Sequence, residues 1–189
     1  MRPIGVFGGT FDPVHRAHLA LARTALGALD PARILWIPTG APPYREPPVA
    51  SAAHRVAMLE LALAGEDRFV LDRRELAPQA SGYTVDTLGA LRAELGEAVP
   101  LVLLMGADQY LKLETWHRWR ELAALCRLAV FTRPGERLED AAVQIVPMAP
   151  LEISATAIRD RIGRGEEVSA LVPARVLEYI RRNHLYGHP

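Results

Sequence analysis

Residues 4–18 read IGVFGGTFDPVHRAH, which is a short apolar run, two glycines, and then a segment with two histidines three residues apart. The apolar run predicts a buried strand over 4–7, and the glycines after it predict a tight turn. Leu19, Ala22 and Leu26 then recur at helical spacing until Gly27, where we expect the helix to stop. The order of strand, glycine turn and helix is the opening unit of an α/β fold.

The same alternation of strand and helix continues along the chain. Short apolar runs predict further strands over 34–37, 69–71, 101–105, 128–131 and 144–146. Apolar side chains at helical spacing predict helices that begin after Ser51, after Thr84, near Ala155 and near Pro173. Strands that are apolar throughout are buried on both sides, so we predict a doubly wound parallel sheet with helices on both faces. Ligands of such folds bind at the carboxyl ends of the strands.

Length and composition limit the classes of protein to consider. A chain of 189 residues holds one well-buried core, so we assign 1–189 to a single domain. Its 22 basic side chains equal its 22 acidic ones, whereas proteins that bind nucleic acid usually carry a basic excess, so we expect no nucleic-acid partner. The single cysteine, Cys126, fits a reducing compartment. No run reaches the roughly 18 apolar residues of a membrane span, and the first residues lack the regions of a signal peptide. We therefore expect a cytoplasmic protein with no membrane partner.

The loop after the first strand carries the pattern GGxFDPxHxxH over residues 8–18. Near a helix start, free backbone N–H groups favour anions, and His15 and His18 face the same way there, so they can bind phosphate oxygens. Gly8 and Gly9 let a ligand approach the backbone closely. The structural alternative is a glycine turn with two exposed histidines, and the complete pattern disfavours it.

A second candidate segment, Gly106 to Asp108, follows the fourth predicted strand. Asp108 can accept hydrogen bonds from a ribose, and Trp116 can stack on a flat heteroaromatic ring. The alternative makes Asp108 a helix cap, and Trp116 and Trp119 core residues.

A third segment, residues 153–159, reads ISATAIR. Ser154 and Thr156 bring hydroxyls to a helix start, and Arg159 brings a cation one turn further on, which suits a triphosphate. The alternative makes Ser154 an N-cap and Arg159 a solvated helix residue.

The GGxFDPxHxxH pattern and the later ISxTxxR segment together resemble the HxGH-type nucleotidyltransferases. These enzymes transfer a nucleotidyl group from a nucleoside triphosphate to a phosphate or a phosphate-bearing acceptor. The resemblance implies a Rossmann-like α/β domain. Ala17 stands where that family most often has Gly.

Several segments are similar to those of one branch, the nicotinate mononucleotide adenylyltransferases. These segments are residues 37–45 (IPTGAPPYR), 82–87 (GYTVDT), 106–108 (GAD) and 173–180 (PARVLEYI). Tyr44 and Gly82 replace the His and Ser that are common there. The similarity runs from Val6 to Ile180, which is nearly the whole chain.

This resemblance implies an enzyme that transfers AMP from ATP to nicotinate mononucleotide, giving deamido-NAD and pyrophosphate in NAD biosynthesis. It implies Mg²⁺ as the cofactor, bound to phosphate oxygens and water rather than to a protein metal site, and catalytic roles for His15, His18 and Arg159. The residues implied for ATP binding are Gly8, Gly9, Thr10, Phe11, His15, His18, Gly106, Asp108, Arg133, Ile153, Ser154, Thr156 and Arg159. The residues implied for acceptor binding are Thr39, Gly40, Tyr44, Arg45, Tyr83, Thr84, Trp116 and Arg133.

Other functions stay open from the sequence alone. The acceptor could be nicotinamide mononucleotide or phosphopantetheine, or the chain could be a nucleotide-binding sensor without turnover. The GYTVDT segment and Trp116 favour a pyridine nucleotide, and the intact histidines and Arg159 favour turnover. Whether the chain forms a homo-oligomer also stays open.

Overall fold

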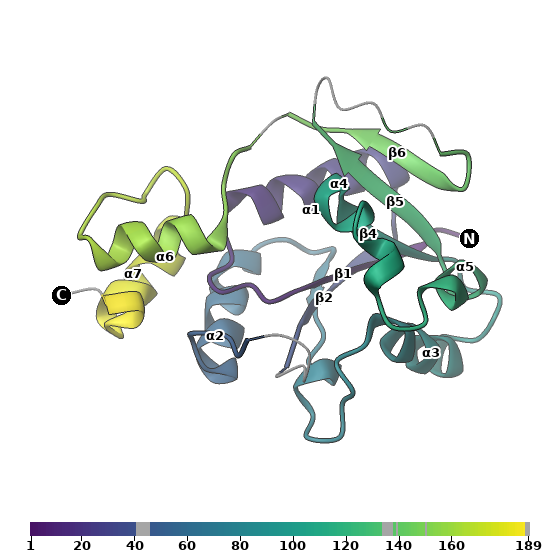
Figure 1. Cartoon of the computed structure of the whole chain (residues 1–189), viewed down its shortest axis with the longest axis horizontal. Helices are drawn as coiled ribbons and strands as arrows, with labels where there is room; N and C mark the ends of the chain where they lie inside the picture. Colours follow the sequence, from purple (N-terminus) through teal and green to yellow (C-terminus); the bar gives the residue numbers. More distant parts are fainter. Residues whose placement is uncertain (41–45, 134–137, 139, 150, 188–189) are drawn as a thin grey trace.

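A parallel sheet with helices on both faces organises residues 1–40, 46–133, 138, 140–149 and 151–187, which the computed structural model describes (Figure 1). The strands are β1 (Ile4–Gly9), β2 (Arg33–Pro38), β3 (Phe69–Leu71), β4 (Leu101–Gly106), β5 (Arg127–Thr132) and β6 (Val143–Pro147). The longer helices are α1 (Arg16–Leu29), α2 (Ala52–Leu63), α3 (Thr84–Leu95), α6 (Ala155–Gly163) and α7 (Ala174–Arg182). The short helical segments are η1 (Arg74–Leu76), α4 (Ala107–Tyr110), η2 (Leu113–Thr115), η3 (Trp119–Glu121), α5 (Leu122–Leu125) and η4 (Leu185–Gly187).

The sheet has the strand order β3-β2-β1-β4-β5-β6, and every neighbouring pair is parallel. The chain builds outward from β1 to β3 on one side and then returns to start β4 on the other side of β1. The strand order therefore reverses between β1 and β4, and this is where an open α/β sheet forms its ligand crevice. The prediction of a doubly wound parallel sheet is confirmed.

Each central strand sends alternate side chains to opposite faces, and helices bury both sets. Trp36 of β2 and Phe7 of β1 belong to the core under α1, α2, α6 and α7. Leu35 and Val6, one residue away on the same strands, belong to the core under α3 and α5. Burial on both sides explains why these strands are apolar throughout.

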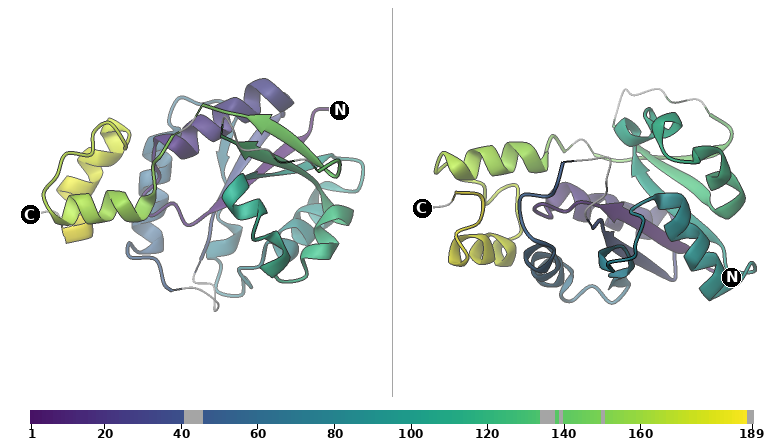
Figure 2. Two further views of the ribbon diagram at one scale, coloured as in Figure 1. Left: turned by 45° about the horizontal axis from the view of Figure 1, so that its top comes forward. Right: turned by 60° about the horizontal axis from the view of Figure 1, so that its bottom comes forward.

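The last two helices lie together at the end of the molecule opposite the N-terminus (Figures 1 and 2). In this region α7 packs on α2, and the η4 turn packs on α6. The C-terminal part of the chain is thereby held beside the loop that follows β1, although the two are far apart in the sequence.

Two helix boundaries differ from the sequence prediction. Gly27 does not stop α1, which continues to Leu29 and ends at Asp30 with a left-handed φ of 41°. Leu26 and Leu29 pack against the core, and this packing outweighs the modest helix propensity cost of one exposed glycine. Thr84 is the first residue of α3 rather than the residue before it.

Other predicted boundaries are confirmed. Ser51 caps α2 by accepting a hydrogen bond from the backbone N–H of His54 (3.3 Å).

Cys126 is buried, and burial raises the pKa of its thiol to about 11. Within the described part of the chain, no helix has the length and apolar character to cross a membrane.

Candidate active site

The candidate site is built on the loop that joins β1 to α1, residues 10–15, which we call the phosphate loop. Gly8 and Gly9 end β1, and Gly106 ends the neighbouring strand β4, so both strands deliver glycines to the carboxyl edge where the strand order reverses. On the other side of β1, the backbone N–H of Thr39 donates to the carbonyl of Gly9 (2.9 Å). The loops that follow β1, β2 and β4 therefore meet at one edge of the sheet.

The two histidines lie at the start of α1 with their rings in contact. His15 is the N-cap residue, and its backbone N–H donates to Nδ1 of His18 (3.2 Å). The imidazoles stack with centroids 3.7 Å apart and an angle of 18° between their planes. Phe11 presents an edge-on contact to His18 with centroids 5.0 Å apart. The predicted pair is thus held in one fixed arrangement rather than exposed on a turn.

Burial lowers the pKa of His15 to about 4. It also lowers the pKa of His18 well below its usual value, and the nearby His15 adds to that effect. Both rings are therefore neutral at pH 7 in the free protein, where they offer hydrogen bonds rather than full positive charges.

A buried carboxylate, Asp12, holds the phosphate loop in place. One carboxylate oxygen accepts the backbone N–H of Val49 (2.7 Å), and the other accepts the backbone N–H of Ala50 (3.2 Å) and the hydroxyl of Tyr186 (2.6 Å). Next to it, the buried Arg55 of α2 donates to the carbonyl of Thr10 (2.8 Å). No sequence pattern indicates these roles for the side chains of Asp12, Arg55 and Tyr186.

The predicted cation reaches the phosphate loop from the other end of the chain. Arg159 of α6 donates through Nη1 to the carbonyl of Asp12 (2.8 Å), 147 residues earlier in the sequence. Its Nη2 donates to the hydroxyl of Thr156 (3.3 Å). Ser154 is the N-cap of α6 and accepts the backbone N–H of Ala157 (3.1 Å), as the structural alternative expects. Ile153 directly precedes this cap. Arg159 is tied to the loop rather than fully solvated, so for this residue the alternative is wrong.

At the end of β4, Gly106 is the N-cap of α4, so the alternative that made Asp108 the cap is wrong. The Asp108 carboxylate folds back over this turn, so that a Cβ on residue 106 would be 2.7 Å from its Oδ1. Trp116 and Trp119 are half-buried and pack against the core under α3. The core alternative for the two tryptophans is therefore correct in part, and one portion of each ring remains exposed.

The residues predicted for the acceptor lie on the loops after β2 and before α3. Gly40 lies against η1, where an added Cβ would approach the carbonyl oxygen of Glu75 to 2.3 Å, so only glycine fits. The carboxyl group of Glu75 accepts from the hydroxyls of Thr87 (2.7 Å) and Thr39 and so links the first turn of α3 to the loop after β2, and burial raises its pKa. Tyr44 and Arg45 lie outside the described residues. Arg133 is exposed just after β5, on the same edge of the sheet.

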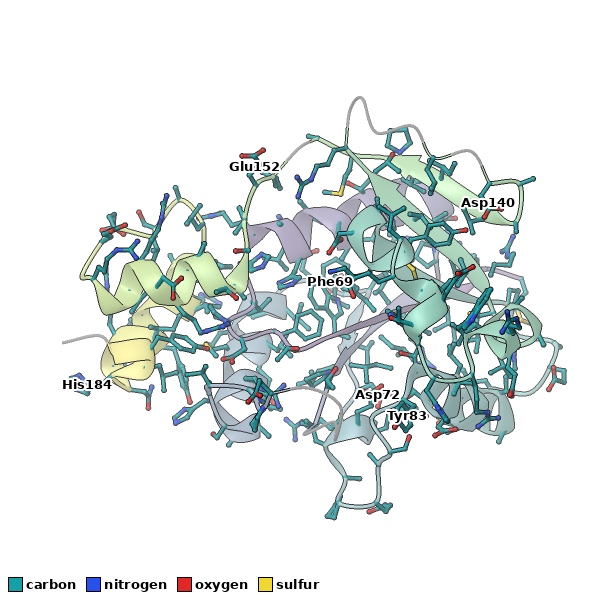
Figure 3. All side chains as sticks on the ribbon, in the orientation of Figure 1. Phe69, Asp72, Tyr83, Asp140, Glu152 and His184 are labelled. Atoms are coloured by element: carbon teal, nitrogen blue, oxygen red, sulfur yellow. The ribbon has the colours of Figure 1, made fainter. Side chains whose placement is uncertain are left out.

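Tyr83 precedes α3 and stacks on His117, with ring centroids 4.2 Å apart. Figure 3 labels Tyr83 and also Glu152, which lies just before α6 on the opposite side of β1 in that view. Of the predicted acceptor residues, Thr39 donates its backbone N–H to the carbonyl of Gly9 at the end of β1 (2.9 Å), whereas Arg159 of the predicted triphosphate residues donates to the carbonyl of Asp12 (2.8 Å). The sequence analysis missed His117 and Glu75, although both lie near predicted segments.

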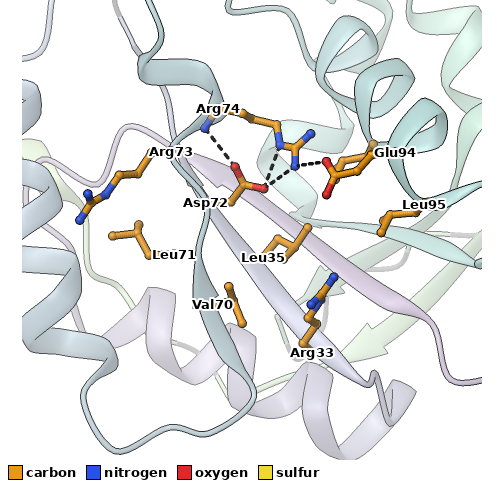
Figure 4. Close-up of a pocket in the computed structure, with 10 residues that line it drawn as sticks. Arg33, Leu35, Val70, Leu71, Asp72, Arg73, Arg74, Glu94 and Leu95 are labelled. Carbon is orange, nitrogen blue, oxygen red and sulfur yellow. Dashed lines mark hydrogen bonds and ion pairs between the residues drawn. The ribbon is translucent and has the colours of Figure 1, made fainter.

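A cavity of about 490 Å³ lies elsewhere, between β2, β3 and α3 (Figure 4). Arg74 pairs there with Asp72 (2.7 Å) and Glu94 (3.0 Å). Among the described residues that line this cavity, none belongs to the predicted ATP or acceptor site. The site is therefore defined by the carboxyl edge of the sheet and not by this cavity.

Comparison with known proteins agrees with this arrangement of strands and loops. Residues 6–161 match the cytidylyltransferase-like family, and the chain therefore belongs to that family. Within it, the chain is 44% identical over 207 residues to a nicotinate-nucleotide adenylyltransferase of Laribacter hongkongensis, a match that covers 97% of this chain and 94% of that relative. It is also 42% identical over 211 residues to the protein of that name from Pseudomonas aeruginosa, which covers 98% of both chains. The family resemblance predicted from the sequence is confirmed.

Solved structures share the fold. The nicotinic acid mononucleotide adenylyltransferase of Plasmodium falciparum superposes with a TM-score of 0.84 over 100% of this chain and 99% of that one, at 15% identity. That protein was solved in complexes with APC and with NaAD. This likeness confirms the Rossmann-like fold.

Proposed function

We propose that this chain transfers AMP from ATP to nicotinate mononucleotide, giving deamido-NAD and pyrophosphate. The observation that carries the proposal is the meeting of the stacked His15–His18 pair and Arg159 at one loop. The names and the identity of its relatives support the same reaction. Residues 1–189 act in this proposal as one nucleotidyltransferase domain, and the cytoplasmic location expected from the sequence belongs to the proposal.

The chemistry requires position and charge rather than a protein nucleophile. The 5′-phosphate of the acceptor attacks the α-phosphorus of ATP, the bond to the β-phosphate oxygen breaks, and pyrophosphate leaves on the opposite side. In this proposal His18 donates a hydrogen bond to the α-phosphate, and His15 binds the neighbouring phosphate oxygens. Arg159, with Ser154 and Thr156, binds the β- and γ-phosphates, where negative charge gathers as pyrophosphate leaves.

In this proposal the nucleotide lies against the segment from the end of β1 into the phosphate loop, which consists of Gly8, Gly9, Thr10 and Phe11. Gly8 has open space around the position of a Cβ, so a ligand can approach the backbone there. Asp108 accepts from the ribose at the end of β4. Ile153 and Arg133 complete the nucleotide side from the segment before α6 and the end of β5.

Mg²⁺ belongs to the proposal as the ion that arrives with ATP. Within the described ranges, no group of three or more His, Cys, Asp or Glu side chains is placed to hold a metal. Substrate phosphates and water can supply most of the oxygen ligands of Mg²⁺, so the protein needs to provide few carboxylates. In this proposal the ion is therefore held through the triphosphate. When bound, the ion neutralises phosphate charge.

The acceptor binds between Thr39, Gly40, Tyr83, Thr84 and Trp116 in this proposal, with Tyr44, Arg45 and Arg133 as further partners. The exposed part of Trp116 stacks on the pyridine ring. The backbone N–H of Tyr83 already donates to the hydroxyl of Ser81 (3.2 Å), so the carboxylate meets the first N–H groups of α3, from Thr84 onward. A site that offers N–H groups favours an acid over an amide, because an amide nitrogen leaves one donor unpaired.

The test measures pyrophosphate release from ATP in the presence of Mg²⁺. Nicotinate mononucleotide, nicotinamide mononucleotide and phosphopantetheine are each supplied alone as the acceptor. We expect fast release with the nicotinate acceptor and much slower release with the other two. ATP binding without release for any acceptor would instead identify a nucleotide sensor, and faster release with phosphopantetheine would exclude a pyridine acceptor.

Two variants, measured in the same assay, test the phosphate role of His18 and the stacking role of Trp116. His18→Ala is expected to remain folded and to lower turnover by about 10²- to 10³-fold, which is typical for the loss of one preorganised donor. Trp116→Ala is expected to raise the KM for the acceptor more than the KM for ATP. Normal turnover in His18→Ala would refute the phosphate role, and equal effects on both KM values would refute the stacking role.

A further inference from the structure

Tyr186 brings a phenol hydroxyl to the phosphate loop from η4, at the far end of the sequence. The hydroxyl donates to Oδ1 of Asp12 (2.6 Å), a partner 174 residues earlier. Burial raises the pKa of the Tyr186 phenol, and the hydrogen bond to Asp12 raises it further, so the hydroxyl keeps its proton and acts as the donor. No step of the proposed reaction uses this residue directly.

Asp12, the partner of Tyr186, accepts hydrogen bonds through both its carboxylate and its main-chain carbonyl. The carboxylate of Asp12 accepts hydrogen bonds from the hydroxyl of Tyr186 and from the backbone N–H groups of Val49 and Ala50. The main-chain carbonyl of the same residue accepts Nη1 of Arg159 (2.8 Å). The orientation of the Asp12 peptide therefore fixes where the guanidinium of Arg159 lies, and Tyr186 is one of the groups that fix Asp12.

The surroundings make this carboxylate sensitive to the loss of a donor. Asp12 is only 3% exposed, so water cannot easily replace a missing hydrogen bond. The nearby cation Arg55 is 1% exposed and donates through Nη1 to the carbonyl of Thr10, and no hydrogen bond joins it to the Asp12 carboxylate among the described residues. The η4 turn itself packs on α6, the helix that carries Arg159.

We propose that Tyr186 is a positioning residue for nucleotide binding: it fixes the phosphate loop, through Asp12, in the geometry that places Arg159 on the triphosphate. The inference rests on the proposed function for the identity of the nucleotide. It adds a requirement for the phenol hydroxyl, which lies outside the HxGH and ISxTxxR segments.

The test compares Tyr186→Phe with Tyr179→Phe. Tyr179 is a matched control, because it lies on α7, is also half-buried, and pairs through its hydroxyl with Nδ1 of His54 (2.9 Å), away from the phosphate loop. We expect Tyr186→Phe to lose more thermal stability than Tyr179→Phe, because it removes a donor from a buried carboxylate, so ATP binding is measured at a temperature at which both variants are folded. Tyr186→Phe is expected to weaken ATP binding in a calorimetric titration by up to about tenfold, since only part of the stabilisation from a hydrogen bond to a charged group is transmitted to the ligand, and to lower turnover, while Tyr179→Phe changes neither.

A second comparison asks whether Tyr186 acts through Arg159. In an Arg159→Ala background, Tyr186→Phe is expected to weaken ATP binding no further. An equal loss in both backgrounds, or a folded Tyr186→Phe with the ATP affinity and turnover of Tyr179→Phe, overturns the inference. If Tyr186→Phe does not fold, Asp12→Asn weakens the same hydrogen bond at nearly constant size and gives the same readouts. Because ATP affinity is measured without an acceptor, a wild-type protein that binds ATP but converts no acceptor would refute the proposed reaction and leave this test valid.

Discussion

At the scale of single residues, His15 shows how burial determines the charge of the site. The residue is 5% exposed, and its pKa falls to about 4 because the protein shields the imidazole from water. A neutral imidazole can approach His18 closely, as the stacked rings do, without repulsion between two cations. The two rings therefore face the proposed phosphates as neutral hydrogen-bonding groups.

This burial predicts a dependence of stability on pH. The unfolded chain takes up the His15 proton near pH 6.5, whereas the folded protein takes it up only near pH 4, so stability is complete above pH 6.5 and is lost as the pH falls. We expect His15 alone to lower the free energy of unfolding by about 2 kcal/mol between pH 7 and pH 5. Urea unfolding at both pH values measures it. His15→Asn should show a smaller decrease, and a decrease equal to that of the wild type would contradict the prediction.

The residues that could be predicted from the sequence are those within short patterns. His15, His18 and Arg159 lie in such patterns, and the structure brings the first two into contact with each other and the third to the same loop. Asp12 also lies in the first pattern, but its role depends on Tyr186, 174 residues away. Spacing within a short pattern cannot predict a hydrogen bond between residues so far apart in the sequence. The contact between Arg55 and Thr10 could not be predicted for the same reason.

At the scale of elements, the central strands β1, β2 and β4 were predicted well because burial on both sides leaves them almost entirely apolar, and the edge strands β3 and β6 were found from shorter apolar runs. The segment from Ala107 to Leu125 was predicted less well. It consists of α4, η2, η3 and α5, which have three or four residues each. Such elements are too short to show a helical period, so composition alone cannot separate them from loops.

Helix α1 gives a prediction about its one exposed glycine. Gly27 lies in the helix with open space at the position of a Cβ, so Gly27→Ala is expected to raise the free energy of unfolding by about 0.5–1 kcal/mol. Gly65 is the matched control: its Cβ position is equally open, but its φ is +88°, so Gly65→Ala is expected to destabilise the protein. Chemical denaturation of both variants measures the difference. Equal signs for the two changes would show that backbone conformation does not decide the outcome.

At the scale of the whole molecule, the proposed nucleotide site lies where the sheet meets the C-terminal helices. In Figures 1 and 2, α6 and α7 lie beyond one end of the sheet, and Arg159 ties α6 to the phosphate loop. A triphosphate held by both partners adds a second connection between them. Binding of ATP to the proposed site should therefore stabilise both parts together.

Thermal unfolding with and without nucleotide tests this connection. ATP at 100 times its Kd is expected to raise the free energy of unfolding by about 2.7 kcal/mol. AMP at the same concentration should stabilise the protein much less, because it lacks the β- and γ-phosphates assigned to Arg159. If AMP and ATP stabilised the chain equally, the triphosphate role of α6 would be wrong.

The hydrogen bond between Tyr186 and Asp12 also has a consequence for biosynthesis. A ribosome that adds about 5–20 residues per second needs roughly 10 to 35 s to cover the 174 residues from the carboxylate to its phenol partner. A nascent chain that already contains the phosphate loop, the whole sheet and Arg159 still lacks that donor. The growing polypeptide can therefore form the hydrogen bond that fixes the Asp12 carboxylate only after η4 has been synthesised.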